Sequence, residues 1–313
     1  MSVYLSLASI NGKNQEGIGS CFQYHIILNI LCQYLGVNYS FPEDGMFDIA
    51  HYSYNGQNSK SWSNSFVEFF NFSKLEQPDK IIKFSVDDPG TRIFPIHDGK
   101  FGLEKQIDSN FLSLIEENKN SKENILIDID HSHATITQFC ANNIKEIFTK
   151  ERIDKVRNNL VFTGKKYFDD NINISWHIRS ANLNDIPSEI INPYREIYDP
   201  EKDYIRFKNL IYFLKENTKG KEATLHIHSQ GEEDNFSKLL ELKSDNFDIH
   251  LHLNENPISD LYHMSNSDLL IMANSSFSWM ASLMNSNQTI VRDNFNSFTH
   301  NSLKTDYNYT YFI

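Results

Sequence analysis

Residues 172–292 alternate between short apolar segments and longer amphipathic segments, and this alternation constrains the fold more than any other feature of the chain. Strands are predicted over 172–178, 223–228, 247–253, 268–273 and 288–292, separated by helices over 201–216, 233–242, 257–265 and 277–286. Strands that alternate with helices of this length form a parallel sheet with helices on both faces. Such sheets bind ligands beyond the carboxyl ends of their strands.

The first half of the chain predicts a second α/β unit. A strand over residues 3–8 leads through a glycine-bearing loop into an apolar helix over 21–36, and 124–130 has the pattern of a buried strand. An amphipathic helix predicted over 134–159 bridges the two halves. We therefore expect an N-terminal α/β domain and a C-terminal α/β domain, covering residues 1–155 and 156–313.

Composition narrows the class of protein. The 313 residues carry a formal net charge of -12, which argues against a general nucleic-acid binder. The three cysteines, Cys21, Cys32 and Cys140, have no framework spacing and indicate free thiols in a reducing compartment. No segment has the ~20 apolar residues of a membrane span, and the N-terminus lacks the features of a signal peptide. We expect a soluble, cytoplasmic protein.

The strand over 172–178 ends at a polar loop with His177, Ile178 and Arg179. The arginine side chain is a planar, permanently charged fork that suits a diphosphate. The alternative is a surface arginine in a salt bridge. On this stretch alone, that alternative is the more common case.

A second strand end carries Asn274, Ser275, Ser276 and Phe277, which lead directly into a helix. The free N–H groups and the dipole at a helix N-terminus attract an anion. The alternative is that the serines only cap the helix, as serines often do.

Histidines alternate along two neighbouring predicted strands. His226 and His228 share one face of the first, which ends with Ser229, and His250 and His252 share one face of the second. Such pairs can bind zinc, but neither a cysteine nor a third ligand lies nearby in sequence. We expect these histidines to be packed and hydrogen-bonded.

A competing metal site follows the strand over 124–130. Asp128 and Asp130 end this strand, and His131 and His133 follow. Paired carboxylates in this position could hold Mg²⁺ or Mn²⁺ in a metal-dependent hydrolase or transferase. A solvated strand end is the alternative.

Taken together, these segments resemble the α-1,2-fucosyltransferase family and its relatives that use GDP-fucose. The His-x-Arg segment at 177–179 and the run 260–285, which contains Asn-Ser-Ser-Phe-Ser-Trp, are similar to two motifs of that family. Residues 17–24 are similar to its glycine-rich N-terminal loop, one residue shorter. Ser180 stands where the family has a second arginine, and residues 40–120 have no counterpart.

The resemblance implies a GT-B-like architecture, in which two Rossmann-like domains face one another across a cleft. The C-terminal domain would bind a GDP-sugar, expected to be GDP-fucose, and the N-terminal domain would supply much of the site for a glycan acceptor. Arg179 would stabilise the departing diphosphate in an inverting transfer without a metal or other cofactor, and Asp185 and Glu189 are candidate bases by position only. The residues expected to contact the donor are Gly17, Gly19, His177, Arg179, His228, Ser229, Asn254, Glu255, Asn274, Ser275, Ser276 and Phe277.

Because the second arginine of the family motif is missing, a non-catalytic function stays open as an alternative. A descendant of such an enzyme could bind a nucleotide-sugar or a glycan without catalysing transfer. The sequence does not fix the acceptor, the linkage or the oligomeric state.

Overall fold

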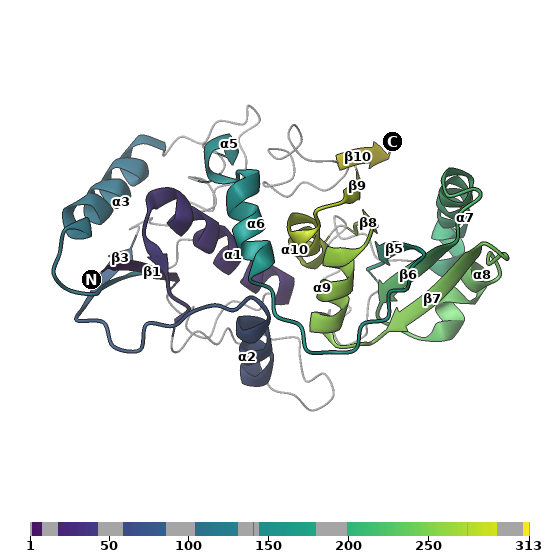
Figure 1. The fold of residues 1–313 in the computed structure, drawn as a ribbon, viewed down its shortest axis with the longest axis horizontal. Coiled ribbons are helices and arrows are strands. Elements are labelled where there is room, and N and C mark those ends of the chain that lie inside the picture. The colour runs from purple at the N-terminus through teal and green to yellow at the C-terminus, as the bar shows by residue number, and fades with distance from the viewer. Residues whose placement is uncertain are drawn as a thin grey trace. The chain divides into compact units, whose positions relative to one another are not determined.

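The structure is a computed structural model that describes residues 2–7, 18–42, 59–85, 104–130, 140, 144–179, 199–273, 275–292 and 309–312. The chain divides into two compact units (Figure 1). Unit 1 comprises Met1–Val161 with Phe298–Leu303, and unit 2 comprises Phe162–Ser297 with Lys304–Ile313. The chain passes between units after residue 161, whereas the sequence placed the boundary after residue 155.

Unit 1 contains a parallel sheet with strand order β2-β1-β4-β3. The last residue of helix α1 is Leu35, and Gly36 terminates the helix as predicted. Gly36 has a φ of 66°, and the Val37 N–H donates to the Cys32 carbonyl at 3.0 Å. Glycine adopts this left-handed conformation without the backbone strain that other residues would have there. The elements are β1 (Val3–Leu7), α1 (Ile18–Leu35), β2 (Asn38–Tyr39), α2 (Ser59–Phe69), β3 (Lys80–Ser85), α3 (Glu104–Lys119) and β4 (Ile125–Asp130).

The single helix predicted over 134–159 is wrong. Over 144–158, where the chain is described without a gap, the structure has two shorter helices, α5 (Ile144–Ile147) and α6 (Lys150–Asn158). Thr149 separates them with an extended backbone, at φ -77° and ψ 153°. Thr149 makes no side-chain capping hydrogen bond, so its extended backbone alone marks where the second helix begins.

Unit 2 contains a parallel sheet whose described strands run in the order β10-β9-β8-β5-β6-β7. The strands predicted in this half are confirmed, and β10 is an additional strand that the sequence pattern did not indicate. The elements are β5 (Ile172–His177), α7 (Pro200–Asn217), β6 (Ala223–Ser229), η2 (Glu233–Phe236), α8 (Ser237–Leu240), β7 (Phe247–Leu253), α9 (Pro257–Asn266), β8 (Leu269–Ile271), α10 (Ser276–Met284), β9 (Gln288–Arg292) and β10 (Tyr309–Phe312). The predicted α/β class with two parallel-sheet units is therefore confirmed.

The strand order of unit 2 reverses direction between β5 and β8. From β5 the chain builds outward through β6 to β7, and it then returns to place β8 on the other side of β5. Numbered within the unit, this is the order 3-2-1-4-5-6 of the Rossmann fold. Ligands of such sheets bind where the strand order reverses, beyond the carboxyl ends of the two central strands.

One face of this sheet is apolar. Alternate residues of β5 and β6, including Ile174, Trp176, Leu225 and Ile227, are buried in one cluster with side chains of α7 and α8. Trp176 packs edge-on against Phe207 of α7, with ring centroids 4.5 Å apart. Apolar burial on this face provides the main driving force for folding of the unit.

The other face of the same sheet is polar and is covered by α9 and the segment that contains Tyr167. His226 contacts His252 through a hydrogen bond of 3.0 Å, and His228 contacts Asp260 of α9 at 2.8 Å. The Tyr167 ring stacks on His263 of α9, with ring centroids 3.4 Å apart. The expectation that the paired histidines are packed and hydrogen-bonded is confirmed. Among the residues that the structure describes, no group of three or more His, Cys, Asp or Glu is arranged to hold a metal ion.

Burial lowers the pKa of three of these histidines and keeps them neutral. The pKa values of His226, His228 and His263 fall to about 2, 3 and 4, first because of burial and then, for each of them, because of neighbouring histidines. Burial also raises the pKa of Asp260. Both shifts in the His228–Asp260 pair favour a neutral imidazole beside a neutral carboxylic acid, because an ion pair is costly in a buried site.

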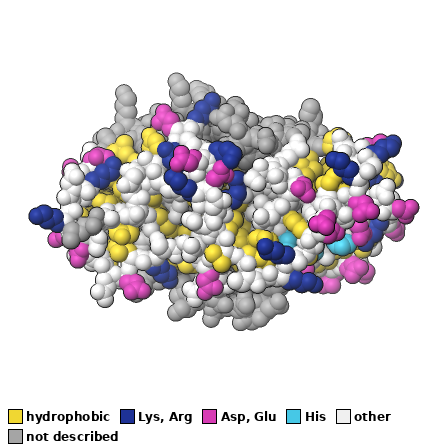
Figure 2. All heavy atoms as spheres, in the orientation of Figure 1, with side chains coloured by type: hydrophobic (Ala, Val, Ile, Leu, Met, Phe, Trp, Pro, Cys, Tyr) yellow, Lys and Arg dark blue, Asp and Glu magenta, His cyan; other side chains and the backbone are white. Residues whose placement is uncertain are grey.

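None of the described helices is both long and apolar enough to cross a membrane. On the face drawn in Figure 2, Lys and Arg side chains are interspersed with Asp and Glu.

We predict that the stability of unit 2 falls between pH 7 and pH 5. The three histidines stay neutral in the folded state, and so does His177 of the same unit, whose pKa burial lowers to about 3. In the unfolded state all four bind protons below their ordinary pKa of about 6.5. Below that value each such histidine lowers the free energy of unfolding by about 1.4 kcal/mol per pH unit, and Asp260 offsets one of the four. Urea unfolding followed by tryptophan fluorescence measures this slope.

The matched pair for this test is His226→Gln and His250→Gln, since the His250 side chain is 50% exposed. The buried substitution should flatten the slope by about 1.4 kcal/mol per pH unit, and the exposed one should leave it near the wild-type value. Equal slopes in all three proteins would contradict the account of the polar face.

Candidate functional site

Arg179 lies just beyond the carboxyl end of β5, at the point where the strand order of unit 2 reverses. The two residues before it are fixed to the neighbouring strand. The Ile178 N–H donates to the His228 carbonyl at 3.0 Å, and the Ser229 hydroxyl donates to the Ile178 carbonyl at 2.7 Å. The backbone that carries the guanidinium is therefore held by β6.

The start of α10 lies beyond the carboxyl end of β8, the strand next to β5. Ser275 is its N-cap residue, with an extended backbone, and its hydroxyl accepts a hydrogen bond from the Phe277 N–H at 3.2 Å. The predicted capping role of this serine is thus observed. The helix dipole still places partial positive charge at this tip.

His177 connects the two strand ends. Its ring meets the Phe277 ring edge-on, with centroids 5.7 Å apart. Burial, the nearby His228 and the charge of Arg179, in that order, lower the pKa of His177 to about 3. The His177 ring therefore lies against Phe277 at the start of α10, and the charge of Arg179, two residues further along the chain, lowers its pKa.

This arrangement can hold an anion. It combines one permanently charged guanidinium with the positive end of a helix dipole at the edge where parallel sheets bind their ligands. His177 is neutral near pH 7 and adds no charge. Its Nδ1 atom is buried and has no hydrogen-bond partner among the described residues.

Two further predicted residues lie at the end of β6 and make contacts inside the protein. His228 uses both ring nitrogens, one with Asp260 at 2.8 Å and the other with the Ser175 hydroxyl at 3.3 Å. Ser229 holds the Ile178 carbonyl, as described above. In this structure both residues position the strand end next to Arg179.

Asn254 and Glu255 lie at the end of β7. Asn254 has a φ of 53°, and its side chain makes hydrogen bonds to both the N–H and the carbonyl of Gly231, at 3.1 and 2.8 Å. Glu255 pairs with His252 at 3.2 Å, a bond that is the first cause of its lowered pKa. The structure shows these two residues shaping the edge of the sheet, and their predicted role in recognising a base stays a prediction.

The remaining predicted residues are placed as follows. Gly19 is buried in the first turn of α1. Ser276 is the first residue of α10. Gly17, Asn274, Asp185 and Glu189 lie outside the described residues, so their predicted roles stay predictions.

The competing acidic pair lies at the end of β4 in unit 1. Asp128 and Asp130 are two residues apart on this strand, and the Asp128 side chain is partly buried. His131 and His133 lie outside the described residues.

Sequence reasoning missed the residues that support the site from the polar face. Asp260 and Ser175 hold the two nitrogens of His228, and Tyr167 stacks against His252 with ring centroids 4.1 Å apart. The available signal was the alternation on β6, where Thr224, His226 and His228 share a face. A polar face that is buried requires polar partners, here from α9 and from β5.

Comparisons with known proteins give structural likeness only. No family model matches the sequence, and no curated protein matches it. Solved structures of POFUT1 match over most of their length. The match to the structure of POFUT1 in complex with GDP-fucose covers 91% of this chain and 94% of the POFUT1 chain, with 8% sequence identity and a TM-score of 0.39.

The structure of POFUT1 in complex with GDP covers 90% of this chain and 95% of its own, with 8% identity and a TM-score of 0.38. The match to the apo form of POFUT1 covers 90% of this chain and 94% of the POFUT1 chain, with 8% sequence identity and a TM-score of 0.36. TM-scores below 0.5 at this identity do not establish a shared activity.

We predict that Ser275→Ala lowers the free energy of unfolding by about 1 kcal/mol, since the Phe277 N–H loses its acceptor. Ser276→Ala is the matched control, because Ser276 is a helical residue and not the N-cap. It should change stability by less than about 0.5 kcal/mol. Urea unfolding monitored by fluorescence compares the two, and a larger loss in Ser276→Ala would show that the cap is misassigned.

Proposed function

We propose that this chain is a glycosyltransferase whose unit 2 binds the diphosphate of a nucleotide-sugar between Arg179 and the start of α10. The observation that carries the proposal is that Arg179 and the start of α10 follow two adjacent parallel strands at the reversal of strand order, with the His177 ring against Phe277. The donor we favour is GDP-fucose, on the resemblance of residues 177–179 and 260–285 to enzymes that use it. The acceptor is a glycan hydroxyl, and the free thiols favour a cytoplasmic location.

Charge development explains why an arginine is placed there. The bond from sugar C1 to the β-phosphate oxygen breaks, its electron pair leaves with the diphosphate, and the sugar gains oxocarbenium character. Arg179 can donate two parallel hydrogen bonds to the phosphate oxygens, and the α10 dipole faces the same charge. A well-placed donor of this kind contributes about 3–4 kcal/mol to transition-state stabilisation.

The acceptor oxygen completes the reaction. It bonds to C1 from the face opposite the leaving group, so the configuration at C1 inverts, and its proton passes to a base or to water. No step requires a metal, because the guanidinium and the helix dipole neutralise the leaving group. Asp185 and Glu189 are the candidate bases from the sequence.

His177 acts as a neutral hydrogen-bonding group in this scheme. A pKa of about 3 makes it a poor base at pH 7, so it does not deprotonate the acceptor. A buried nitrogen without a partner costs free energy, and a hydrogen bond to the bound donor would remove that cost. We assign His177 to donor binding.

Arg179→Ala should reduce turnover of GDP-fucose at least about 100-fold, because the leaving group loses its charged donor. The rate of GDP release in the presence of an oligosaccharide panel measures this, with the fold checked by circular dichroism. Arg179→Lys keeps the positive charge but cannot donate two parallel hydrogen bonds. Its turnover should lie between that of Arg179→Ala and that of the wild type.

Arg206→Ala is the matched control, since Arg206 lies on α7 with a side chain 48% exposed beside Asp203. It should retain wild-type turnover. Undiminished turnover in a folded Arg179→Ala protein would rule out the proposed role of this arginine.

A further inference from the structure

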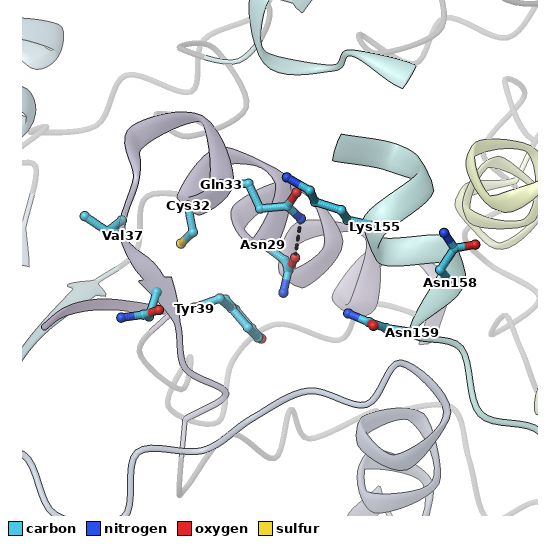
Figure 3. A pocket seen from close by; sticks show the side chains of 9 residues that line it. Asn29, Cys32, Gln33, Val37, Tyr39, Lys155, Asn158 and Asn159 are labelled. Atoms are coloured by element: carbon cyan, nitrogen blue, oxygen red, sulfur yellow. Dashed lines mark hydrogen bonds between the residues drawn. The ribbon is translucent and has the colours of Figure 1, made fainter. Parts of the chain in front are cut away.

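Unit 1 has a pocket between the C-terminal half of α1, β2 and the end of α6 (Figure 3). Its volume is about 400 Å³, within the range of ~300–1,000 Å³ of small-molecule sites. Asn29 and Gln33 line it from α1, and by helix geometry they lie roughly 16–22 Å along the axis from Ile18. The pocket therefore lies toward the end of α1 that is remote from Ile18.

Neutral amide side chains dominate the lining of this pocket. An amide offers both hydrogen-bond donors and an acceptor, as a sugar hydroxyl does. The lining residues, all of which the structure describes, include no carboxylate. The amides are Asn29, Gln33, Asn38, Asn158 and Asn159.

Two of these amides are fixed relative to each other. The Gln33 Nε2 atom donates to the Asn29 Oδ1 atom at 3.1 Å, between residues one helical turn apart on α1 (Figure 3). The Gln33 Oε1 atom is buried and has no hydrogen-bond partner in the described part of the chain. A buried acceptor without a partner is unfavourable, which favours any arrangement that supplies it with a donor.

Apart from Lys155, the other lining residues, Cys32, Val37 and Tyr39, are largely apolar. Val37 and Tyr39 follow the turn at Gly36, and the Tyr39 hydroxyl is hydrogen-bonded to His25 at 2.8 Å, so the tyrosine ring is fixed. Small-molecule sites combine such apolar surface with a few placed polar groups. A sugar ring matches this combination with its C–H groups and its hydroxyls.

The single cation of the lining is already paired. Lys155 contacts Glu151 at 3.0 Å, and both side chains are exposed. An exposed pair in water exerts a weak field. The pocket therefore favours an uncharged ligand over a phosphate or a carboxylate.

We propose that this pocket binds a sugar residue of an uncharged glycan. The proposal does not depend on Arg179 or on a nucleotide donor, and it assigns unit 1 a glycan contact of its own. Asn29 and Gln33 are its central hydrogen-bonding groups, with Asn158 and Asn159 of the α6 end on the other side.

Saturation-transfer NMR on the full chain tests this with methyl glucoside, methyl galactoside, methyl fucoside, N-acetylglucosamine and lactose at millimolar concentration. At least one neutral sugar should receive saturation from the wild-type protein. The double substitution Asn29→Ala/Gln33→Ala should weaken its binding at least about tenfold, because it removes both hydrogen-bonding groups. Both residues are partly exposed on a helix, where alanine is well tolerated.

Asn209→Ala, which removes an exposed amide from α7, is the control and should leave binding unchanged. The proposal fails if none of the neutral sugars binds, or if the double substitution leaves binding unaltered. It also fails if only inorganic phosphate or glucuronate binds and Lys155→Ala abolishes that binding. Neither result bears on the diphosphate site of unit 2, because no nucleotide is present.

Discussion

The parallel pairing of β5 with β8 is the interaction on which the proposed site depends. Ile174, Ser175 and Trp176 of β5 lie opposite Leu269, Leu270 and Ile271 of β8. This pairing joins two segments that are nearly a hundred residues apart and makes them the central strands of the sheet. Their two carboxyl ends, with Arg179 and the start of α10, therefore lie at one edge.

The polar face of the same sheet keeps those strand ends in position. His228 lies beside His177 in register, and its two nitrogens join Ser175 of β5 to Asp260 of α9. The amide of Asn285, just after α10, donates to the carbonyls of Met264 and Ser267 at the end of α9, at 2.9 and 3.0 Å. A buried polar network stabilises the fold only when its members are satisfied, and these bonds link β5, α9 and α10 into one arrangement.

The sequence predicted those parts of the molecule that depend on local pattern. Alternation of apolar and amphipathic segments located β5 to β9, and the apolar run after residue 20 located α1 and its end at Gly36. Two features depend on partners far away in sequence and were missed. The strand β10 is defined by its pairing with β9. The structural role of Asp260 is its hydrogen bond to His228, which lies 32 residues earlier. The break at Thr149 was missed because the amphipathic pattern continues across it.

For the site, the sequence located the strand-end residues but not their contacts. The sequence placed Arg179, His177 and Phe277 at two strand ends, and the structure shows that these ends belong to adjacent strands and that His177 packs against Phe277. Ser229 and Asn254 hold the backbone of neighbouring loops through hydrogen bonds. Such bonds between a side chain and a distant carbonyl leave no periodic signal in a sequence. The amide-lined pocket of unit 1 could not be predicted for the same reason, since α1, β2 and α6 meet only in the folded chain.

Calorimetry with GDP and GMP tests the central claim most directly, because the two ligands differ only in the phosphate that Arg179 and α10 would hold. A charged hydrogen bond contributes about 1.5–3 kcal/mol, so GDP should bind at least about tenfold more tightly than GMP. Equal affinities for the two nucleotides, or no binding of GDP, would contradict the account.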